Sequence, residues 1–203
     1  MDARLSPDVL VVSGTAIAPY VDDLARLRSE VFRQWPYLYD GDAAYEAGYL
    51  KVYLDSPFSV VVLVLDGDKV VGASTGLPLA DAGEAFRAPF DHASIDPLEV
   101  FYCGESVLLP RYRGRGFGHR FFEEREAHAR SLGGFAWTAF CAVERREDDP
   151  RRPPFHRDND DFWRRRRYAP HPRLSVQLPW REVGGGEVDH TLRYWLRPLE
   201  RVI

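Results

Sequence analysis

Hydrophobic and polar residues follow strand-like and helix-like periods along the N-terminal third of the chain. The β-branched run at residues 9–17 predicts a strand. After Pro19, apolar residues recur at three- and four-residue steps and share one face of a predicted helix: Val21, Leu24, Leu27 and Val31. Turn-forming residues within 35–42 end this helix, and a second, short helix is predicted over residues 43–54.

The middle third predicts a hairpin, a strand and an amphipathic helix. Apolar runs at residues 59–65 and 69–78 are joined by Asp-Gly-Asp, which is a strong hairpin signal. A loop is expected over residues 79–98, and a further strand over 100–109. A helical period then runs from 118 to 132 and ends at two glycines.

The last third predicts a strand at residues 135–143, a short helix at 160–167 and two final strands at 174–178 and 191–197. The charged, proline-rich residues between 144 and 158 are expected to form a loop. No internal repeat and no long linker divides the chain. We therefore expect residues 1–203 to form one α/β domain.

Composition narrows the functional classes. A chain of 203 residues buries roughly 70% of its unfolded surface and folds without a disulfide or a metal. The formal net charge of −4 argues against a broad nucleic-acid-binding surface, which carries a basic excess. Nearly all basic residues are arginines, since only Lys51 and Lys69 are lysines. This bias is consistent with anion recognition by guanidinium groups, or with a coding bias of the genome.

The cysteines and the apolar runs indicate where such a protein works. Cys103 and Cys141 lie inside apolar, strand-like runs, which predicts buried reduced thiols. No apolar stretch has the length of a transmembrane helix, and the N-terminus lacks the pattern of a signal peptide. We expect a cytoplasmic protein with no membrane, nucleic-acid or metal partner.

The chemistry is concentrated in a short loop between a predicted strand and a predicted helix. Its sequence is Arg113-Gly114-Arg115-Gly116-Phe117-Gly118. Glycines at alternate positions remove the Cβ atoms that would block close backbone approach. The helix N-terminus adds unpaired N–H groups and the positive end of the helix dipole. Together with the two arginines, these groups form a cradle for a phosphate or a diphosphate.

Other glycine-rich loops fit the spacing less well. A dinucleotide-binding turn has G-x-G-x-x-G, and a P-loop has Gly-Lys-Ser/Thr after its glycines. Neither spacing occurs here, because the glycines are at 114, 116 and 118 and His119 follows them. The remaining alternative is a tight turn that binds no ligand.

The loop resembles the R-x-x-G-x-G signature of the GNAT (Gcn5-related N-acetyltransferase) superfamily, with Arg113, Gly116 and Gly118 at the fixed positions. The element order over residues 9–197 is also similar to that family. The resemblance implies a mixed, mostly antiparallel central sheet with splayed middle strands, flanked by helices. It also implies acetyl-CoA as cofactor, held by these residues: Val107, Leu108, Leu109, Arg113, Gly114, Arg115, Gly116, Phe117, Gly118, His119, Asn159 and Trp163.

The resemblance also implies that an amine attacks acetyl-CoA directly, assisted by a base. Glu105 is the best candidate, because many members of the family carry a glutamate on this strand and a charge in an apolar strand has no obvious solvated alternative. The alternative is a structural carboxylate that pairs with an arginine. Strand alternation places Tyr102 and Ser106 on the opposite face, where they are second choices for proton transfer.

Two positions depart from the family pattern. Trp163 stands where the family often has a general-acid tyrosine, and an indole cannot protonate a thiolate. Tyr168, another hydroxyl or bulk water is then the acid, or no acid is needed. The CoA-contacting asparagine is displaced as well, with His156 in its slot and Asn159 nearby.

In the family, the region between the first two helices covers the acceptor site. Here it contains Trp35, Tyr37, Tyr39 and Asp40, and Ser74 and Thr75 on the hairpin are expected to add polar contacts. Aromatic walls with one carboxylate suit a cation with an apolar body. The alternative is a small aromatic core, with Asp40 capping the next helix.

The functional prediction is an N-acetyltransferase that acts on an amine of a small molecule or a peptide. A non-catalytic module that binds or senses acyl-CoA on the same scaffold is the alternative. Homodimers are common in the family, but nothing in the sequence identifies an interface.

Overall fold

The computed structural model describes residues 7–200. Its strands are β1 (Asp8–Ser13), β2 (Val60–Asp66), β3 (Lys69–Pro78), β4 (Val100–Leu108), β5 (Trp137–Val143), β6 (Ala169–Arg181) and β7 (Glu187–Pro198). Its helices are α1 (Val21–Phe32), α2 (Ala43–Asp55), the single turn α3 (Glu84–Arg87), α4 (Phe117–Leu132) and α5 (Asp160–Arg165). The predicted order of strands and helices is therefore confirmed.

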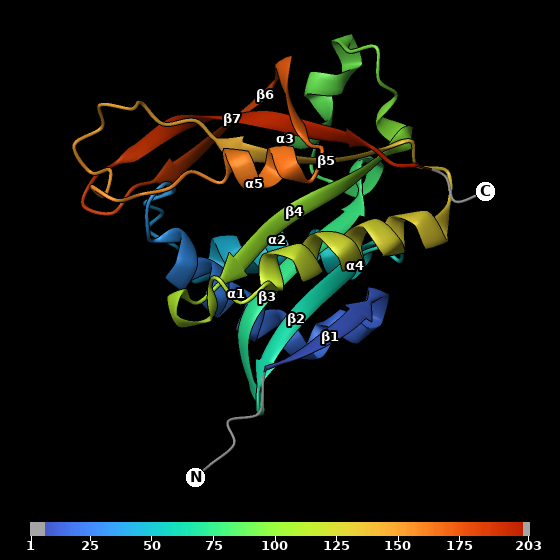
Figure 1. Ribbon diagram of the computed structural model, residues 1–203, viewed down its shortest axis with the longest axis horizontal. Coiled ribbons are helices and arrows are strands. Elements are labelled where there is room, and N and C mark those ends of the chain that lie inside the picture. The colour runs from blue at the N-terminus through green and yellow to red at the C-terminus, as the bar shows by residue number, and fades with distance from the viewer. Residues whose placement is uncertain (1–6, 201–203) are drawn as a thin grey trace.

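The strands form one seven-stranded sheet in the order β1-β2-β3-β4-β5-β7-β6. Every neighbouring pair is antiparallel except β4 and β5, which are parallel. The helices α1 and α2 pack on one face of the sheet, and α4 and α5 lie on the other (Figure 1). We call these the α1/α2 face and the α4 face. This arrangement confirms the predicted mixed, mostly antiparallel sheet flanked by helices.

Several strand boundaries differ from the sequence prediction, and two of these differences have an identifiable physical reason. The first strand ends at Ser13 because Gly14 turns the chain with a φ of +54°, and a 3₁₀ helix then leads into α1. The strand β6 begins at Ala169, five residues earlier than predicted, and contains three prolines. Prolines are tolerated there because β6 is an edge strand, whose outer N–H groups need no partner within the sheet.

The middle strands separate partway along their length. Pairing between β4 and β5 is limited to three positions, which end at Tyr102 and Ala139. Beyond Tyr102, β4 continues to pair with β3, while β5 continues to pair with β7. The predicted splay of the middle strands is confirmed, and it begins at the end of this short parallel pairing.

A β-bulge in β4 coincides with the start of the splay. Ser106 pairs with Ser74, but Cys103 pairs with Gly76, so Gly104 and Glu105 together oppose the single residue between these β3 positions. Such a bulge shifts the alternation of side chains along a strand. Tyr102 and Glu105 therefore share the α1/α2 face, where both line one pocket. The prediction that Tyr102 faces away from Glu105 is wrong because simple alternation ignores the bulge.

Glycine is required at the bulge because α2 approaches it closely. A Cβ atom at position 104 would overlap the hydroxyl of Tyr53 and would lie 2.7 Å from Thr75 Oγ1. Tyr53 and Thr75 are both buried, so neither can move aside into solvent. The packing of α2 against β4 depends on the missing side chain.

Two further expectations concern membrane-spanning helices and the cysteines. No helix between residues 7 and 200 combines the length and the apolar character needed to cross a membrane. Cys103 and Cys141 are free and buried, which agrees with the expectation of reduced thiols.

The Gly104→Ala variant is expected to lower the free energy of unfolding by about 1–3 kcal/mol, because the added methyl overpacks a buried contact. Urea denaturation measures the change. The control is Gly48→Ala in α2, where no atom lies within 4 Å of an added Cβ. That change is expected to stabilise the helix by about 0.5–1 kcal/mol. Equal effects of the two variants would contradict the proposed contact.

Candidate active site

A pocket lies on the α1/α2 face of the sheet, where β4 and β5 separate. It has a cavity volume of about 80 Å³. Aromatic side chains from several elements provide much of its wall: Phe32, Tyr37, Tyr39, Tyr45, Phe86 and Trp180. We refer to it as the aromatic pocket. Tyr45 is 49% exposed and lies at its mouth, whereas most of the other lining residues are buried or partly buried.

Glu105 lies in the aromatic pocket with only one of its carboxylate oxygens engaged. Its Oε2 accepts hydrogen bonds from Arg28 Nη1 at 2.9 Å and from the Tyr49 hydroxyl at 2.8 Å. Its Oε1 has no partner among the described residues, although the side chain is only 3% exposed. A buried carboxylate oxygen without a donor is costly. Glu105 thus pairs with an arginine and keeps one carboxylate oxygen without a partner among the described residues.

Arg28 links Glu105 to a second buried carboxylate. Its Nε donates to Glu46 Oε2 at 2.5 Å, and its guanidinium stacks 3.7 Å from the centre of the Tyr49 ring. Burial disfavours the charged guanidinium, but Glu105, Tyr49 and Glu46 together raise the pKa of Arg28 well above its ordinary value. One cation and two carboxylates leave the cluster with one excess negative charge, so it attracts a further cation.

The tyrosines around Glu105 remain neutral hydrogen-bond donors. Burial, followed by the Glu105 charge, raises the pKa of Tyr49 well above its ordinary value. Burial and the neighbouring Cys141 do the same to the pKa of Tyr102. The Tyr102 hydroxyl lies 3.0 Å from Cys141 Sγ. Burial also raises the pKa of the Cys141 thiol to about 12, so this cysteine is not a thiolate nucleophile.

The bulge that carries Glu105 is held from the α4 face by Arg125. This buried side chain of α4 donates from Nη1 to the carbonyl oxygens of Thr75, at 3.2 Å, and Glu105, at 3.1 Å. Thr75 Oγ1 accepts from the Glu105 backbone N–H at 3.2 Å. Thr75 was predicted to contact the substrate, but the structure places it under the bulge, where it orients Glu105. Ser74 is fully buried and, pairing with Ser106, lies toward the α4 face.

The predicted acceptor residues between α1 and α2 separate into two groups. Tyr37 and Tyr39 line the aromatic pocket, but Trp35 and Asp40 do not. Asp40 forms an ion pair with Arg33 at 2.6 Å. It does not cap α2 either, because the N–H of Tyr45 in the first turn is bonded to the side chain of Asp42 at 3.0 Å.

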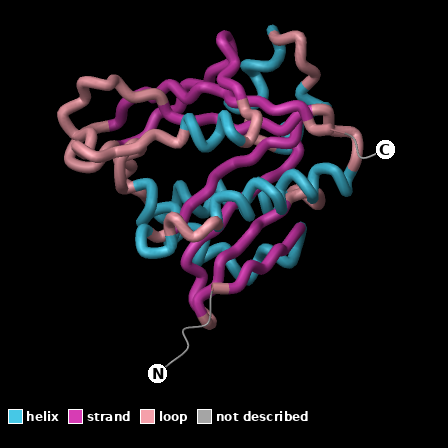
Figure 2. The backbone as a smooth tube through the Cα atoms, in the orientation of Figure 1, coloured by secondary structure: helices cyan, strands magenta, loops and turns pink. Residues whose placement is uncertain are grey.

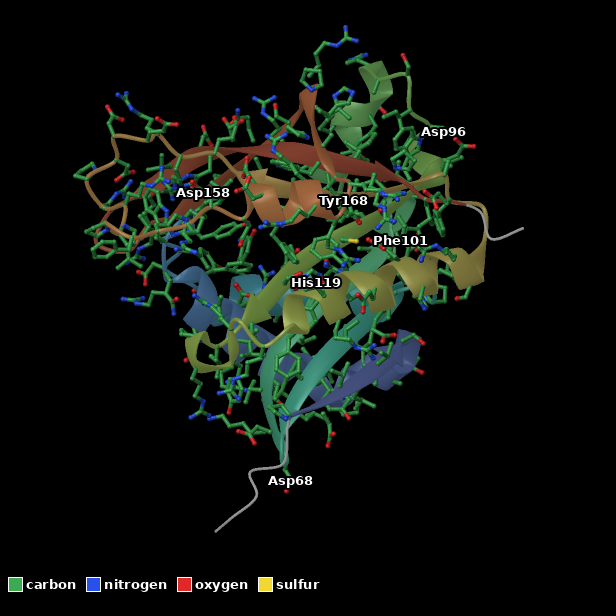
Figure 3. All side chains as sticks on the ribbon, viewed as in Figure 1. Asp68, Asp96, Phe101, His119, Asp158 and Tyr168 are labelled. Carbon is green, nitrogen blue, oxygen red and sulfur yellow. The ribbon has the colours of Figure 1, made fainter. Side chains whose placement is uncertain are left out.

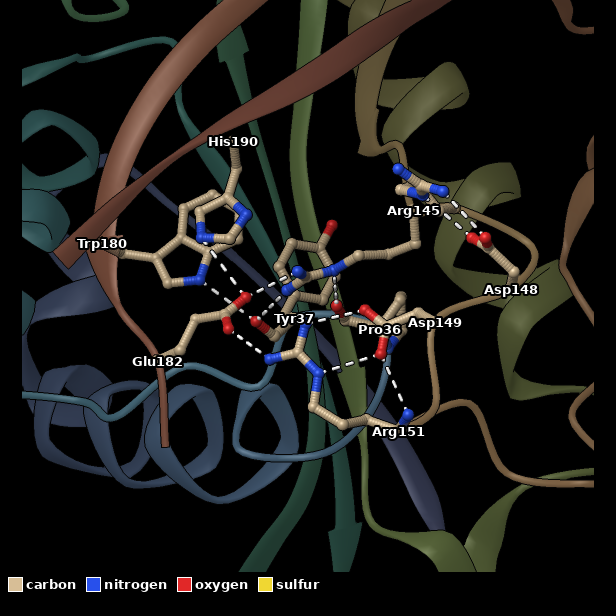
Figure 4. A network of polar contacts seen from close by, with 10 residues as sticks. Pro36, Tyr37, Arg145, Asp148, Asp149, Arg151, Trp180, Glu182 and His190 are labelled. Atoms are coloured by element: carbon tan, nitrogen blue, oxygen red, sulfur yellow. Dashed lines mark hydrogen bonds and ion pairs between the residues drawn. The ribbon is translucent and has the colours of Figure 1, made fainter. Parts of the chain in front are cut away.

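A network of polar contacts holds Tyr37 and Trp180, two residues that line the aromatic pocket (Figure 4). Arg145, from the loop after β5, donates to the carbonyl oxygens of Pro36 at 2.6 Å and Tyr37 at 2.8 Å, and to Glu182 Oε1 at 2.5 Å. Trp180 Nε1 also donates to the Tyr37 carbonyl, at 3.1 Å. We call this network the clamp. It joins the α1–α2 loop, the loop after β5 and the β6–β7 hairpin, which lie side by side in Figure 2.

The glycine-rich loop has the backbone of an anion-binding turn. Gly114 and Gly116 have φ angles of +75° and +87°, and α4 begins at Phe117. Among the described residues, the N–H groups of residues 114–118 have no hydrogen-bond acceptor. Five consecutive free donors at a helix N-terminus match the requirement of a diphosphate. Arg113 and Arg115 are exposed at this loop.

The free edge of β4 continues from this loop toward the aromatic pocket. The Leu109 N–H bonds to the Val71 carbonyl at 3.0 Å, and Val107 pairs with Ala73, so both residues use their backbone groups on β3. Backbone groups alternate in direction along an antiparallel strand. Those of Ser106 and Leu108 therefore face the gap between β4 and β5. Arg113 Nε already bonds to the Leu108 carbonyl at 3.0 Å.

The remaining predicted cofactor residues lie on the α4 face, next to α5. The His119 ring lies 5.0 Å from that of Phe162, and exposed Asn159 is the N-cap of α5. Trp163 packs between the rings of Phe140 and Trp195, at 4.9 and 5.0 Å. Its indole is part of an aromatic cluster on this face.

Tyr168 is separated from Glu105 by the sheet. Its hydroxyl bonds to Thr138 Oγ1 at 2.8 Å and to Glu126 Oε1 at 3.2 Å. Thr138 lies in the short stretch where β4 and β5 still pair. Figure 3 labels Tyr168 and His119 on the side of the sheet that carries α4 and α5. The structure thus brings Tyr102, but not Tyr168, to the pocket that contains Glu105.

Several residues of the site are absent from the sequence prediction. They include the two partners of Glu105, the bulge glycine and two residues of the clamp: Arg28, Tyr49, Gly104, Arg145 and Trp180. Arg28 had a detectable signal, since it lies four residues after Leu24 on the apolar face of a predicted helix. The residues of the clamp had no signal in the sequence, because they lie far apart along the chain. Within residues 7–200, no group of His, Cys, Asp or Glu side chains is arranged to bind a metal ion.

Comparison with known proteins places this geometry in a family. Residues 22–149 match the model of the acetyltransferase (GNAT) family. A comparison with curated proteins found no match. Among solved structures, the putative acetyltransferase yncA from Salmonella typhimurium with acetyl-CoA has a TM-score of 0.57 at 12% identity, covering 98% of this chain and 96% of that chain.

Two further solved structures are similar in fold. NAA60 from Arabidopsis thaliana, in complex with a bisubstrate analogue, has a TM-score of 0.60 at 10% identity and covers 96% of this chain and 100% of that chain. The ribosomal-protein-alanine N-acetyltransferase from Brucella melitensis has a TM-score of 0.59 at 11% identity, covering 94% and 99%. At these identities the comparison establishes the fold.

The Arg28→Met variant tests the buried ion cluster. Removing the cation leaves two buried carboxylates unpaired, so the free energy of unfolding is expected to fall by about 3–5 kcal/mol. The control is Arg33→Met, which breaks an ion pair whose arginine is 57% exposed and is expected to cost at most about 1 kcal/mol. Urea denaturation at neutral pH compares the two, and similar losses would argue against the cluster.

Proposed function

Because this chain belongs to the acetyltransferase (GNAT) family, whose model matches residues 22–149, we propose that it transfers an acetyl group to a primary amine held in the aromatic pocket. Family membership makes it an acyl-CoA-dependent acetyltransferase that uses acetyl-CoA. The acceptor, a small molecule or a peptide, is the proposed part. The observation that carries it is the buried Glu105, which lines a pocket at the point where β4 and β5 separate and whose Oε1 has no partner among the described residues.

The residues of the glycine-rich loop and of β4 fit acetyl-CoA. The free N–H groups of residues 114–118 suit its diphosphate, with Arg113 and Arg115 adding positive charge. The backbone groups of Ser106 and the N–H of Leu108, which do not pair with β3, suit the amide-containing pantetheine arm, which would pair with β4 like an added strand. When bound, acetyl-CoA supplies an acyl group activated as a thioester.

Glu105 and Tyr102 are the proposed catalytic residues. A primary amine is protonated at neutral pH, with a pKa of about 10, so the excess negative charge of the pocket draws it in as an ammonium ion. Glu105 accepts the ammonium proton, and the amine nitrogen forms the new C–N bond while the thioester C–S bond breaks. Tyr102 donates a hydrogen bond to the departing sulfur. The amine nitrogen loses its second proton as the amide forms, this proton neutralises the coenzyme A thiolate, and Glu105 releases the first proton to solvent.

Tyr102 also bears on the non-catalytic alternative. That alternative was motivated by Trp163 in place of the usual tyrosine. The Tyr102 hydroxyl supplies a donor in the pocket itself, and its partner is the weakly accepting thiol of Cys141. We therefore favour the catalytic function.

The Glu105→Gln variant is expected to lower kcat by about 10²- to 10⁴-fold, because an amide cannot accept the ammonium proton. Initial rates of CoA release across a panel of amines measure the effect. The control is Glu99→Gln, an exposed carboxylate outside the pocket, which is expected to leave the rate unchanged. Calorimetric titration with acetyl-CoA must show unchanged affinity in both variants. Full activity of Glu105→Gln would exclude Glu105 as the base.

The Gly116→Val variant tests the diphosphate cradle. A β-branched residue at a φ of +87° costs about 1–2 kcal/mol, and relief of that strain withdraws the N–H groups from the ligand. The affinity for CoA is expected to fall by about tenfold or more. Gly186→Val is the control, because that glycine has no positive φ and no atom within 4 Å of an added Cβ. Equal CoA affinities in calorimetry would contradict the cradle.

A further inference from the structure

We propose that the acceptor is a compact monoamine: one primary amine on an apolar body of about one ring, with no carboxylate, no second amine and no peptide chain. This inference rests on the proposed function and adds the acceptor class to it. Three properties of the aromatic pocket support it, namely its charges, its size and the clamp that holds part of its wall.

The charges of the pocket accept one cation and no anion. Arg28 and Glu105 are the charged residues among its described lining. Arg28 already donates from Nε to Glu46 and from Nη1 to Glu105, so its one positive charge is outweighed by two carboxylates and a carboxylate on the substrate would be a third negative charge in the cluster. Glu105 offers a single free oxygen. A second ammonium group would lie against aromatic walls without a carboxylate, and burying an unpaired charge is strongly unfavourable.

The size and the walls of the pocket favour a small apolar body. Protein cavities of about 150 Å³ hold a benzene molecule, and this cavity is about 80 Å³. The enclosed part of the acceptor is therefore limited to a short alkyl chain or to part of one ring, and the rest of a ring lies in the mouth beside the exposed Tyr45. Leu178, Trp180 and Leu192 from β6 and β7 line it together with Phe32 and Tyr39. Removing an apolar body from water against such walls is favourable.

The clamp leaves few backbone groups for a peptide. A bound peptide chain needs hydrogen-bond partners for its amides, usually the free backbone of a groove. Here backbone groups of the α1–α2 loop are already bonded to the end of β6 and the residues after it. The Asp40 N–H bonds to the Arg181 carbonyl at 2.8 Å, and the Leu38 carbonyl accepts from the Val183 N–H at 2.7 Å. The Tyr37 carbonyl is occupied by Arg145 and Trp180. These backbone groups of the α1–α2 loop already have hydrogen-bond partners within the protein and are not free to bind a peptide.

Matched pairs of amines test each property separately. Phenethylamine and phenylalanine differ by a carboxylate, pentylamine and cadaverine differ by a second amine, and a hexapeptide with a free N-terminal alanine tests the peptide chain. With acetyl-CoA and the full chain, kcat/KM is expected to be at least about tenfold higher for phenethylamine and pentylamine than for their partners and the peptide. Equal or faster acetylation of phenylalanine, cadaverine or the peptide overturns the proposal.

Variants of the clamp show whether it sets this preference. Arg145→Met removes the contacts to Pro36, Tyr37 and Glu182. It is expected to lower the ratio of kcat/KM for phenethylamine to kcat/KM for the peptide by at least about threefold. Arg146→Met is the control, since that neighbouring side chain is 84% exposed and contacts Asp148. Calorimetric titration with acetyl-CoA verifies that both variants are folded. An unchanged preference in Arg145→Met overturns the role of the clamp.

A binding experiment separates this inference from the proposed function. If no amine releases CoA, the proposed catalysis fails, but thermal shifts in the presence of CoA still measure acceptor binding. Stabilisation by phenethylamine and pentylamine, without stabilisation by phenylalanine, cadaverine or the peptide, then supports the acceptor class. Absence of stabilisation by the two monoamines, or equal stabilisation by their partners, overturns it.

Discussion

The bulge at Gly104 and Glu105 is the constraint on which the candidate active site depends. Two residues of β4 opposite one residue of β3 change the direction of the strand where it leaves β5. The same bulge turns Glu105 toward α1 and α2, and the buried guanidinium of Arg125 holds its carbonyl from the other face. The separation of the strands and the position of the proposed base thus have one structural origin.

The ion cluster around Arg28 connects stability with function. A buried arginine between two carboxylates is stable only because its geometry satisfies both, and the excess negative charge remains unbalanced. An enzyme that places such a charge beside its acceptor site tolerates a local cost in the free protein. Under the proposed function, an arriving ammonium ion relieves that cost, so the affinity for this cation follows from the buried ion cluster.

The sequence predicted the order of the elements well because each has its own local signal, such as helical periodicity in α1 or Asp-Gly between β2 and β3. The loop at residues 113–118 could be predicted from the sequence for the same reason. The bulge could not be predicted, because the alternation of side chains along β4 depends on its pairing with β3. The clamp could not be predicted either, since Arg145 and Trp180 come together only after folding. A single domain over residues 1–203 and a homodimer stay predictions.

The prolines of β6 affect how the molecule meets its neighbours. Pro170, Pro172 and Pro179 lie in the strand at one end of the sheet, and each lacks the N–H that strand addition requires. The α1–α2 loop occupies the tip of the same edge, where Tyr39 bridges to Glu182. This edge is therefore a poor template for a foreign strand, which protects the protein from edge-to-edge aggregation. Self-association through a continuous intermolecular sheet is disfavoured on this side.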